Sequence, residues 1–117
     1  MTTAPLLDTA RLLARLEDDK ELLEEIFIVF ISEAPERRAK FEAALEAQDM
    51  DRLTLLAHSL KGASGTLVAE PLREASTALE LAARAKDAQG VATLAPVVID
   101  LLARTVEFMA GVDMAGV

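Results

Sequence analysis

Cysteine, tryptophan and tyrosine are absent from this 117-residue sequence, and histidine occurs once, as His58. Without cysteine, the chain has no disulfides, no thiolate zinc sites and no cysteine nucleophile. A single histidine excludes HExxH sites and metal centres with several imidazole ligands. It also excludes the ferritin-like di-iron site, which needs two Glu-x-x-His pairs, because Leu55 stands three residues before His58. His58 is therefore the first candidate for chemistry.

Basic and aromatic residues are also scarce. Twenty Asp and Glu residues against 12 Lys and Arg residues give a net charge of −8, and aromatics make up 3%. Nucleic-acid binding favours basic surfaces and stacking aromatics, so we expect no nucleic-acid partner. The longest strongly apolar run, Ile26 to Ile31, is too short for a membrane span. Met1 to Asp8 lack the features of a secretion signal. We expect a soluble, cytoplasmic protein without a membrane partner.

Leucine and alanine dominate the apolar residues and period-two alternation is absent, which predicts an all-α protein. We expect one domain over residues 1–117, with a core from about 9 to 109 and a mobile tail over 110–117. Four amphipathic helices with short connections predict an antiparallel up-down-up-down four-helix bundle. A short extra N-terminal helix is expected to lie over the bundle.

Capping residues and prolines predict the boundaries of the helices. The first covers about 9–16, the second continues with a kink past position 35, and a turn over 86–90 precedes a fifth helix at about 91–109. The signals are, in chain order, the cap Asp8, the cap Asp18, the kink at Pro35, the cap Asp49 or Asp51, and Pro71 in the first turn of the fourth helix. The residues expected to face the core are Leu22, Ile26, Phe30, Phe41 and Leu45, then Leu53, Leu56, Leu60, Ala63 and Leu67, then Leu72, Ala75, Leu79 and Ala83, then Leu94, Val98, Leu101, Thr105 and Phe108.

His58 lies on the polar face of the third predicted helix. At about 100° per residue, it is about 200° from Leu56 and nearly opposite the apolar stripe. Lys61, Gly62 and Gly65 lie within about 60° of it. Each glycine costs about 1 kcal/mol relative to alanine in a helix interior. A lone histidine is most often an ordinary surface residue, but two glycines beside it indicate a surface that leaves room for another molecule.

The residues around His58 indicate group transfer. An exposed, neutral imidazole is a nucleophile. The Lys61 ammonium would disfavour the imidazolium and would attract a phosphoryl group on the ring. No acidic residue at positions 54, 55, 61 or 62 could orient the imidazole, and no Ser-His-Asp constellation or phosphate-binding glycine loop is evident. We therefore expect a domain that accepts and holds a group without hydrolysing or binding a nucleotide.

The segment Ala57-His58-Ser59-Leu60-Lys61-Gly62-Ala63-Ser64 resembles the signature His-x-Leu-Lys-Gly-x-Ser of the histidine-containing phosphotransfer (HPt) family. Residues 19–23 with Phe30 and residues 33–36 are similar to the family's second helix, and Leu72, Leu79-Glu80 and Ala83-Arg84 are similar to its fourth. The resemblance covers about residues 9–109. One departure is Val68, where the family commonly has glycine at the end of the third helix.

The resemblance implies an antiparallel four-helix bundle that relays phosphoryl groups between the receiver aspartates of two-component proteins. It implies that His58 is phosphorylated, through Nε2, that Lys61 steadies the phosphoryl charge and that Gly62 leaves space for the receiver. The further partner-binding candidates are Leu55, Ser64, Gly65, Glu80 and Arg84, and for Glu80 and Arg84 the resemblance implies polar contacts either to the His or to the partner. Additional docking candidates by wheel position are Ala57, Leu12 and Leu13. Ordinary packing of the first helix is the alternative for these docking residues.

The expected partners are response-regulator receiver domains and a hybrid or sensor histidine kinase. We expect no cofactor in the domain itself, Mg²⁺ on the receiver, and no autonomous kinase or phosphatase activity. Three alternatives stay open: a bundle that docks a receiver or kinase without taking phosphate, a structural or oligomerising helical protein, and the phosphorylatable domain of a larger kinase. We prefer a stand-alone carrier.

Overall fold

The computed structural model describes residues 5–117. Residues 1–4, which belong to the expected single domain and to the stretch without a secretion signal, lie outside the described residues. The described part contains five helices and no strand. The helices are α1 (Thr9–Arg15), α2 (Lys20–Glu46), α3 (Met50–Thr66), α4 (Glu70–Arg84) and α5 (Ala88–Ala110). The prediction of an all-α chain is confirmed.

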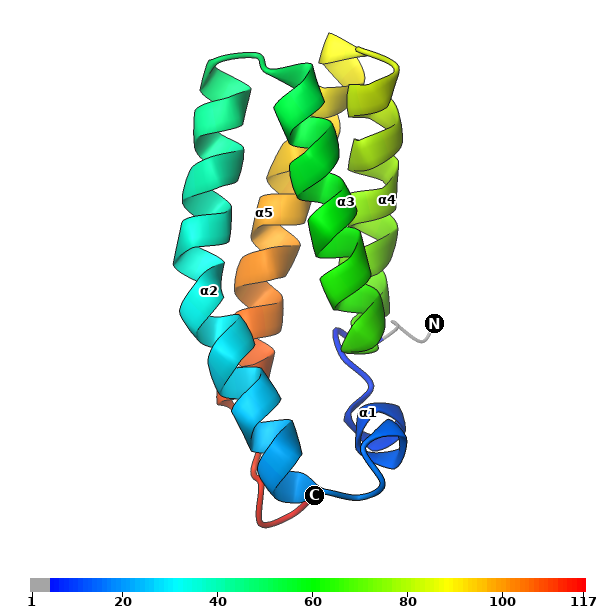
Figure 1. Cartoon of the computed structure of the whole chain (residues 1–117), viewed down its shortest axis with the longest axis vertical. Helices are drawn as coiled ribbons and strands as arrows, with labels where there is room; N and C mark the ends of the chain where they lie inside the picture. The colour runs from blue at the N-terminus through cyan, green and yellow to red at the C-terminus, as the bar shows by residue number, and fades with distance from the viewer. Residues whose placement is uncertain (1–4) are drawn as a thin grey trace.

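Helices α2 to α5 run side by side and alternate in direction, and the short α1 lies near the end of the bundle where α2 begins (Figure 1). This arrangement confirms the predicted four-helix bundle with an extra N-terminal helix. Pro35 lies inside α2 and the helix continues through it, so the expectation of one long helix is confirmed. No helix among residues 5–117 combines the length and the apolar character needed to cross a membrane.

Four of the helices begin at an aspartate whose side chain accepts a hydrogen bond from a backbone N–H three residues later. Asp8 and Asp49 confirm two predicted caps. The cap of α2 is Asp19, however, because Asp18 has a positive φ of 62° and belongs to the preceding turn. Capped by Asp87, α5 begins at Ala88, three residues earlier than expected, so the turn lies at 85–87 and the prediction that it extends to Gly90 is wrong. Pro96 lies within that helix, where its fixed φ suits the helical backbone.

The connections between α2 and α3, α3 and α4, and α4 and α5 are three residues long and share one geometry. In each, the residue after the C-cap is left-handed: Gln48, Val68 and Lys86 have φ of 53°, 56° and 55°. The next N–H bonds back to a carbonyl of the ending helix, as in a Schellman motif. Glycine is the usual residue there, so the family's glycine at the position of Val68 has a conformational reason. Val68 is fully buried and occupies the position at a conformational cost.

We expect glycine substitutions at two of these positions to change stability in opposite directions. Lys86→Gly should raise the free energy of unfolding by about 0.5 kcal/mol, because relief of the left-handed backbone exceeds the entropy that glycine adds to the unfolded chain. Val68→Gly should lower it by roughly 1–2 kcal/mol, because a buried apolar side chain is lost. Urea unfolding followed by circular dichroism measures both. Stabilisation by Val68→Gly would show that strain outweighs burial at this position.

The buried faces of α2 and α5 agree with the prediction only in part: Phe30, Phe41, Val98 and Thr105 are buried as predicted, and the other predicted residues are replaced by neighbours. In α2 the buried side chains are Leu23, Phe27, Phe30, Ala34, Phe41 and Ala44, and in α5 they are Val91, Ala95, Val98, Leu102, Thr105 and Met109. The predicted Leu22 is instead exposed, and Ile26, Leu45, Leu94, Leu101 and Phe108 are half-buried. Both helices carry apolar residues at adjacent positions, such as 22 and 23 or 101 and 102, so periodicity alone could not choose between two stripes.

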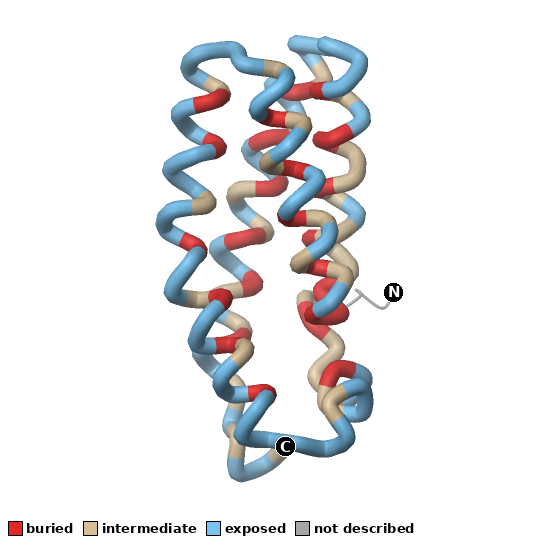
Figure 2. The backbone as a smooth tube through the Cα atoms, in the orientation of Figure 1, coloured by how far each residue is buried: buried red, intermediate tan, exposed pale blue. Residues whose placement is uncertain are grey.

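The predictions for α3 and α4 were closer. Leu53, Leu60, Leu67, Leu72, Leu79 and Ala83 are buried as predicted, whereas Leu56, Ala63 and Ala75 are half-buried. Small side chains, Ala57 and Ser64 on α3 and Ser76 on α4, are fully buried instead, which lets the two helices pack closely. Figure 2 shows the buried positions on the inward sides of the helices. The same core continues into the C-terminal segment, where Val112, Met114 and Val117 pack against it. The mobility of residues 110–117 stays a prediction.

Candidate functional site

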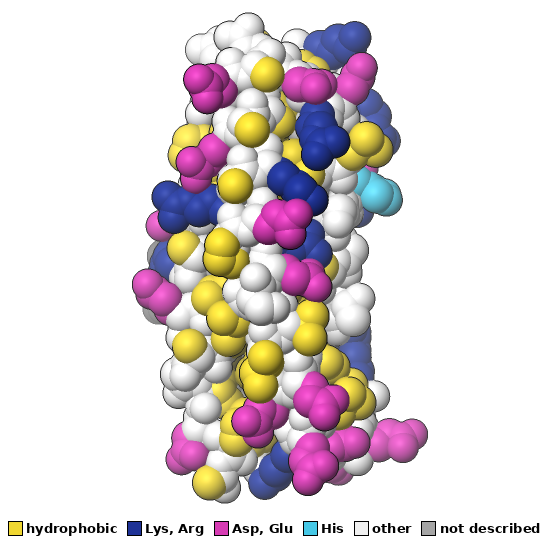
Figure 3. Space-filling model, turned by 60° about the vertical axis from the view of Figure 1, so that its left-hand side comes forward, with side chains coloured by type: hydrophobic (Ala, Val, Ile, Leu, Met, Phe, Trp, Pro, Cys, Tyr) yellow, Lys and Arg dark blue, Asp and Glu magenta, His cyan; other side chains and the backbone are white. Residues whose placement is uncertain are grey.

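His58 lies in the middle of α3, on the side that adjoins α4. Its side chain is 63% exposed, although its neighbour Ala57 is completely buried. The prediction that His58 faces the solvent is therefore confirmed. Figure 3 shows the single histidine standing out from the surface of the bundle. An exposed imidazole on a rigid helix can be approached by a second macromolecule without any change in the bundle.

The Glu80 carboxylate of α4 lies beneath the imidazole and is 3% exposed. His58 Nδ1 is 2.9 Å from Glu80 Oε2. Lys61 Nζ donates to Oε1 at 2.8 Å, and Arg84 Nη2 donates to Oε2 at 2.7 Å. One buried carboxylate thus holds a histidine, a lysine and an arginine from two helices. Two cations and one carboxylate leave a net charge of +1 when the imidazole is neutral.

Glu80 is an ionised carboxylate in this arrangement. The hydrogen bond from Lys61 lowers the pKa of the Glu80 carboxyl most strongly, and the bond from His58 lowers it further, while burial acts in the opposite direction. An ionised carboxylate can only accept, so Nδ1 of His58 must be the donor and must carry the ring proton. In the neutral imidazole the lone pair then resides on Nε2, to which residues 5–117 donate no hydrogen bond. The exposed ring nitrogen is therefore the nucleophilic one.

On its own helix His58 has no acidic residue at positions 54, 55, 61 or 62. Its acidic partner comes from α4, and Glu80 and Arg84 were noted only through the resemblance. One signal was available: Glu80 falls between the inward-facing Leu79 and Ala83, on the buried face of an amphipathic helix. A carboxylate at such a position requires partners, because an unpaired buried charge is strongly unfavourable.

We expect Glu80 to make stability depend on acid pH. Its pKa lies below the ordinary 4.5 in the folded protein, so its stabilising contribution is complete above that pH and is lost as pH falls through the lower folded value. Glu80→Gln should reduce the free energy of unfolding by about 2 kcal/mol at pH 7, because the buried group loses two cationic partners that can return to water. Urea titrations from pH 3 to 7 should show the two proteins converging in acid. A constant difference across that range would contradict the assignment.

Gly62, Gly65 and Ser64, which were all predicted to lie at the partner surface, have different surroundings in the structure. At Gly62 an added Cβ would meet no atom within 4 Å, so the protein itself does not need glycine there. At Gly65 a Cβ would come within 3.3 Å of Arg73 Cδ, so this glycine gives room to a side chain of α4. Ser64 is completely buried and donates to the Leu60 carbonyl at 2.6 Å. The prediction of partner contact is therefore wrong for Ser64, because its side chain packs between helices.

Some of the other predicted docking residues are exposed, and others are buried. Leu55 is 69% exposed on α3 and stays a candidate, and the Arg84 side chain is exposed beside His58. Ala57 and Leu12 are buried in the core, so the prediction that they contact a partner is wrong; Leu13 is half-buried and packs against the core. For Leu12 and Leu13 this is the ordinary packing of the first helix that was the alternative to docking. Of the two contacts that the resemblance implied for Glu80, to the histidine or to the partner, the structure has the one to His58, and burial leaves the carboxylate little access to a partner.

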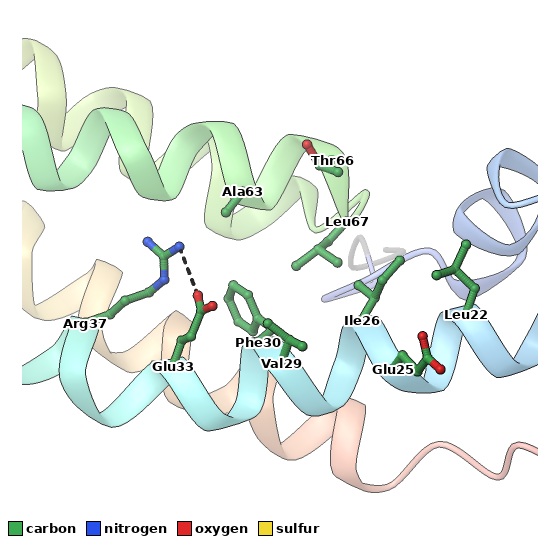
Figure 4. A pocket seen from close by; sticks show the side chains of 10 residues that line it. All are labelled: Leu22, Glu25, Ile26, Val29, Phe30, Glu33, Arg37, Ala63, Thr66 and Leu67. Atoms are coloured by element: carbon green, nitrogen blue, oxygen red, sulfur yellow. Dashed lines mark ion pairs between the residues drawn. The ribbon is translucent and has the colours of Figure 1, made fainter.

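A groove of about 390 Å³ runs between α2 and α3 (Figure 4). Its apolar lining includes Leu22 and Val29, which are exposed because they lie outside the buried stripe of α2. Arg37 lies at one end, 3.7 Å from Glu33 and with its guanidinium 5.9 Å from the centre of the Phe30 ring. This groove was not predicted, because the apolar pattern of the sequence placed Leu22 in the core.

The bundle and its single exposed, oriented imidazole have the features of a histidine phosphocarrier. The family model described as "Hpt domain" matches residues 25–108, which is most of the chain. The chain belongs to the Hpt family, as the resemblance predicted, and is a phosphotransfer carrier of two-component phosphorelays.

A solved structure supports the same conclusion. The chain is similar to histidine-containing phosphotransfer protein B (HptB) from Pseudomonas aeruginosa PAO1, with 28% sequence identity and a TM-score of 0.83. The similarity covers 92% of this chain and 94% of the HptB chain, so the two bundles correspond over nearly their whole length. The comparison with curated proteins gave no match.

Proposed function

We propose that Nε2 of His58 accepts a phosphoryl group from the aspartyl phosphate of a receiver domain and passes it to the aspartate of another receiver. The observation that supports this most directly is the 2.9 Å contact between Nδ1 and the buried Glu80 carboxylate. It fixes one ring nitrogen as the donor and leaves the exposed nitrogen with the lone pair. Imidazole in this tautomer needs no general base before it attacks.

In the proposed step, the Nε2 lone pair attacks phosphorus while the bond between phosphorus and the aspartyl oxygen breaks. The receiver aspartate leaves as a carboxylate, and the ring becomes a phosphoimidazolium that keeps its Nδ1 proton. Transfer onward is the reverse step on a second receiver. We propose that each receiver supplies Mg²⁺, which neutralises the transferring group. The domain supplies the nucleophile and its orientation.

Lys61 and Gly62 have proposed roles beside the ring. Lys61 is bonded to Glu80 in the free protein, so its ammonium is held one helical turn from the imidazole. There it adds positive charge where a phosphoryl group would arrive. Gly62 and Leu55 are exposed on the same helix and form the proposed contact surface for the receiver. Arg84, also exposed, bonds to the same Glu80 oxygen as His58.

We infer further that the partners are response-regulator receivers and a hybrid or sensor histidine kinase, and that the domain has neither kinase nor phosphatase activity of its own. Because receivers of this kind act in the cytoplasm, we place the protein there. Such a carrier is expected to be inert towards ATP and to gain phosphate only from a phosphorylated partner or donor.

The test is transfer from Mg²⁺-loaded, phosphorylated receivers to the purified protein, followed as acid-labile phosphate on a gel. The proposal predicts that at least one receiver of a cognate set loses label to the protein within the lifetime of its aspartyl phosphate. Binding of those receivers without any transfer would contradict the carrier and favour a docking-only bundle. Incorporation of label from ATP alone would contradict the absence of kinase activity.

A further inference from the structure

We propose that Glu80 keeps the proton on Nδ1 of His58 after Nε2 has been phosphorylated, and that Lys61 and Arg84, which bond to the same carboxylate, limit how strongly that proton is held. This inference rests on the proposed role of His58 as the phosphorylated residue. It concerns the reactivity of the phosphorylated state, which determines how readily the carrier gives its phosphoryl group away.

The position of the Nδ1 proton decides the leaving group. When the phosphorylated ring carries this proton, the phosphorus–nitrogen bond breaks and its electron pair returns to Nε2, releasing a neutral imidazole. Without the proton, the same cleavage would release an imidazolate anion, which is a far stronger base and a much poorer leaving group. A carrier that must pass its phosphoryl group to a carboxylate therefore benefits from a ring that stays protonated at Nδ1.

The Glu80 carboxylate is placed to stabilise that protonated ring. Its Oε2 lies 2.9 Å from Nδ1, and the carboxylate is almost completely shielded from water. Phosphorylation at Nε2 converts the neutral ring into a cation, so the contact changes from a neutral donor bond to a charge-assisted one. Because the carboxylate is buried, solvent weakens this attraction less than it would weaken a pair in which both groups are exposed.

The two cations limit how strongly Glu80 attracts the Nδ1 proton. An ionised carboxylate has about four lone-pair sites, and three of those on Glu80 receive hydrogen bonds from His58, Lys61 and Arg84. The hydrogen bond from Lys61 is the largest cause of the lowered pKa of the Glu80 carboxyl, and it makes the carboxylate a weaker base. Arg84 occupies a further acceptor site on Oε2. No charged side chain of another described helix forms a hydrogen bond or ion pair with this cluster; α3 contributes His58 and Lys61, and α4 contributes Glu80 and Arg84.

Glu80 and Arg84 should therefore shift the Nδ1 titration in opposite directions. Glu80→Gln removes the negative charge and leaves two unpaired cations near the ring, which disfavours the phosphoimidazolium. Arg84→Leu removes a cation that competes for the same Oε2 atom, and this favours the phosphoimidazolium. Arg104→Leu on α5 is the matched control, because its side chain is similarly exposed (58% against 63%) and also pairs with an acidic residue four positions away.

Phosphoramidate, a small phosphoryl donor, allows the experiment without a receiver. Each protein is phosphorylated with it, and the ³¹P chemical shift and the rate of phosphohistidine hydrolysis are measured against pH. We expect the midpoint of the Nδ1 titration to fall by at least about one pH unit in Glu80→Gln, which makes hydrolysis about tenfold slower above the midpoint. The midpoint should rise by several tenths of a unit in Arg84→Leu and stay unchanged in Arg104→Leu.

An unchanged midpoint in Glu80→Gln, or shifts of the same sign in Glu80→Gln and Arg84→Leu, would overturn the inference. Circular dichroism checks that the variants are folded, and Arg84→Leu provides an independent result at an exposed position. If the opposite shifts occur and no receiver exchanges phosphate with the protein, the carrier function fails while the inference stands. Failure of phosphoramidate to modify His58 in the wild-type protein would overturn both.

Discussion

His58→Gln is expected to reduce phosphoryl transfer from a phosphorylated receiver by about a thousandfold or more, because the nucleophile is removed. The glutamine amide nitrogen has no available lone pair, and the sequence contains no second histidine that could take over. The His58 side chain is largely exposed, so its replacement should leave the helical signal and the unfolding midpoint nearly unchanged. Labelled phosphate and circular dichroism on the same preparations measure the two effects.

The control for this experiment is binding of the receiver. Because most of the contact surface is intact in His58→Gln, the receiver should bind the variant with an affinity within about tenfold of the wild type. Transfer that survives in the variant would remove His58 from the mechanism. Loss of binding together with transfer would mean that the substitution damages docking, and the assignment of His58 as nucleophile would lose its support.

Gly62→Leu should reduce transfer at least about tenfold and leave the fold intact. A side chain at this position meets nothing within the protein, so any obstruction must act on the partner. Replacing glycine with leucine inside α3 should even raise the free energy of unfolding by about 0.5–1 kcal/mol, because glycine is a poor helix former. Ala103→Leu is the matched control, since it adds the same side chain at an exposed position of α5.

Phosphorylation by phosphoramidate separates the two explanations for a defect in Gly62→Leu. The small donor should still modify His58 in this variant, because the imidazole remains accessible to small molecules. Transfer from the receiver at the wild-type rate would contradict the idea that Gly62 leaves space for the partner. A loss of helical signal would instead assign Gly62 to packing of the bundle.

The number of helices and the exposed position of His58 could be predicted because both depend on local patterns. Caps such as Asp8 and Asp49 act within one helical turn, and the angle between His58 and Leu56 follows from helix geometry. The buried stripes of α2 and α5 could be predicted only in part, at Phe30, Phe41, Val98 and Thr105, because adjacent apolar residues elsewhere allow two faces. Neighbouring helices, rather than the sequence of either helix alone, select the one that is buried.

In the site, too, the features that lie on one helix could be predicted, and those that depend on packing between helices could not. The signature around His58 indicated the nucleophile, Lys61 and Gly62, which lie on one helix. Glu80 is 22 residues away in the chain, and only the packing of α3 against α4 brings its carboxylate under the imidazole. Ser64 shows the converse, because a residue inside the signature has a structural reason that the motif does not reveal: it is buried between helices and bonded to a carbonyl.

The most direct test is to identify the atom that carries phosphate. The protein labelled with ¹⁵N at histidine is phosphorylated by a cognate receiver, and the coupling between ³¹P and ¹⁵N is recorded by NMR. We predict coupling to Nε2 of His58, with Nδ1 still carrying the proton that it donates to Glu80. Phosphate on Nδ1, or on any residue other than His58, would contradict the account.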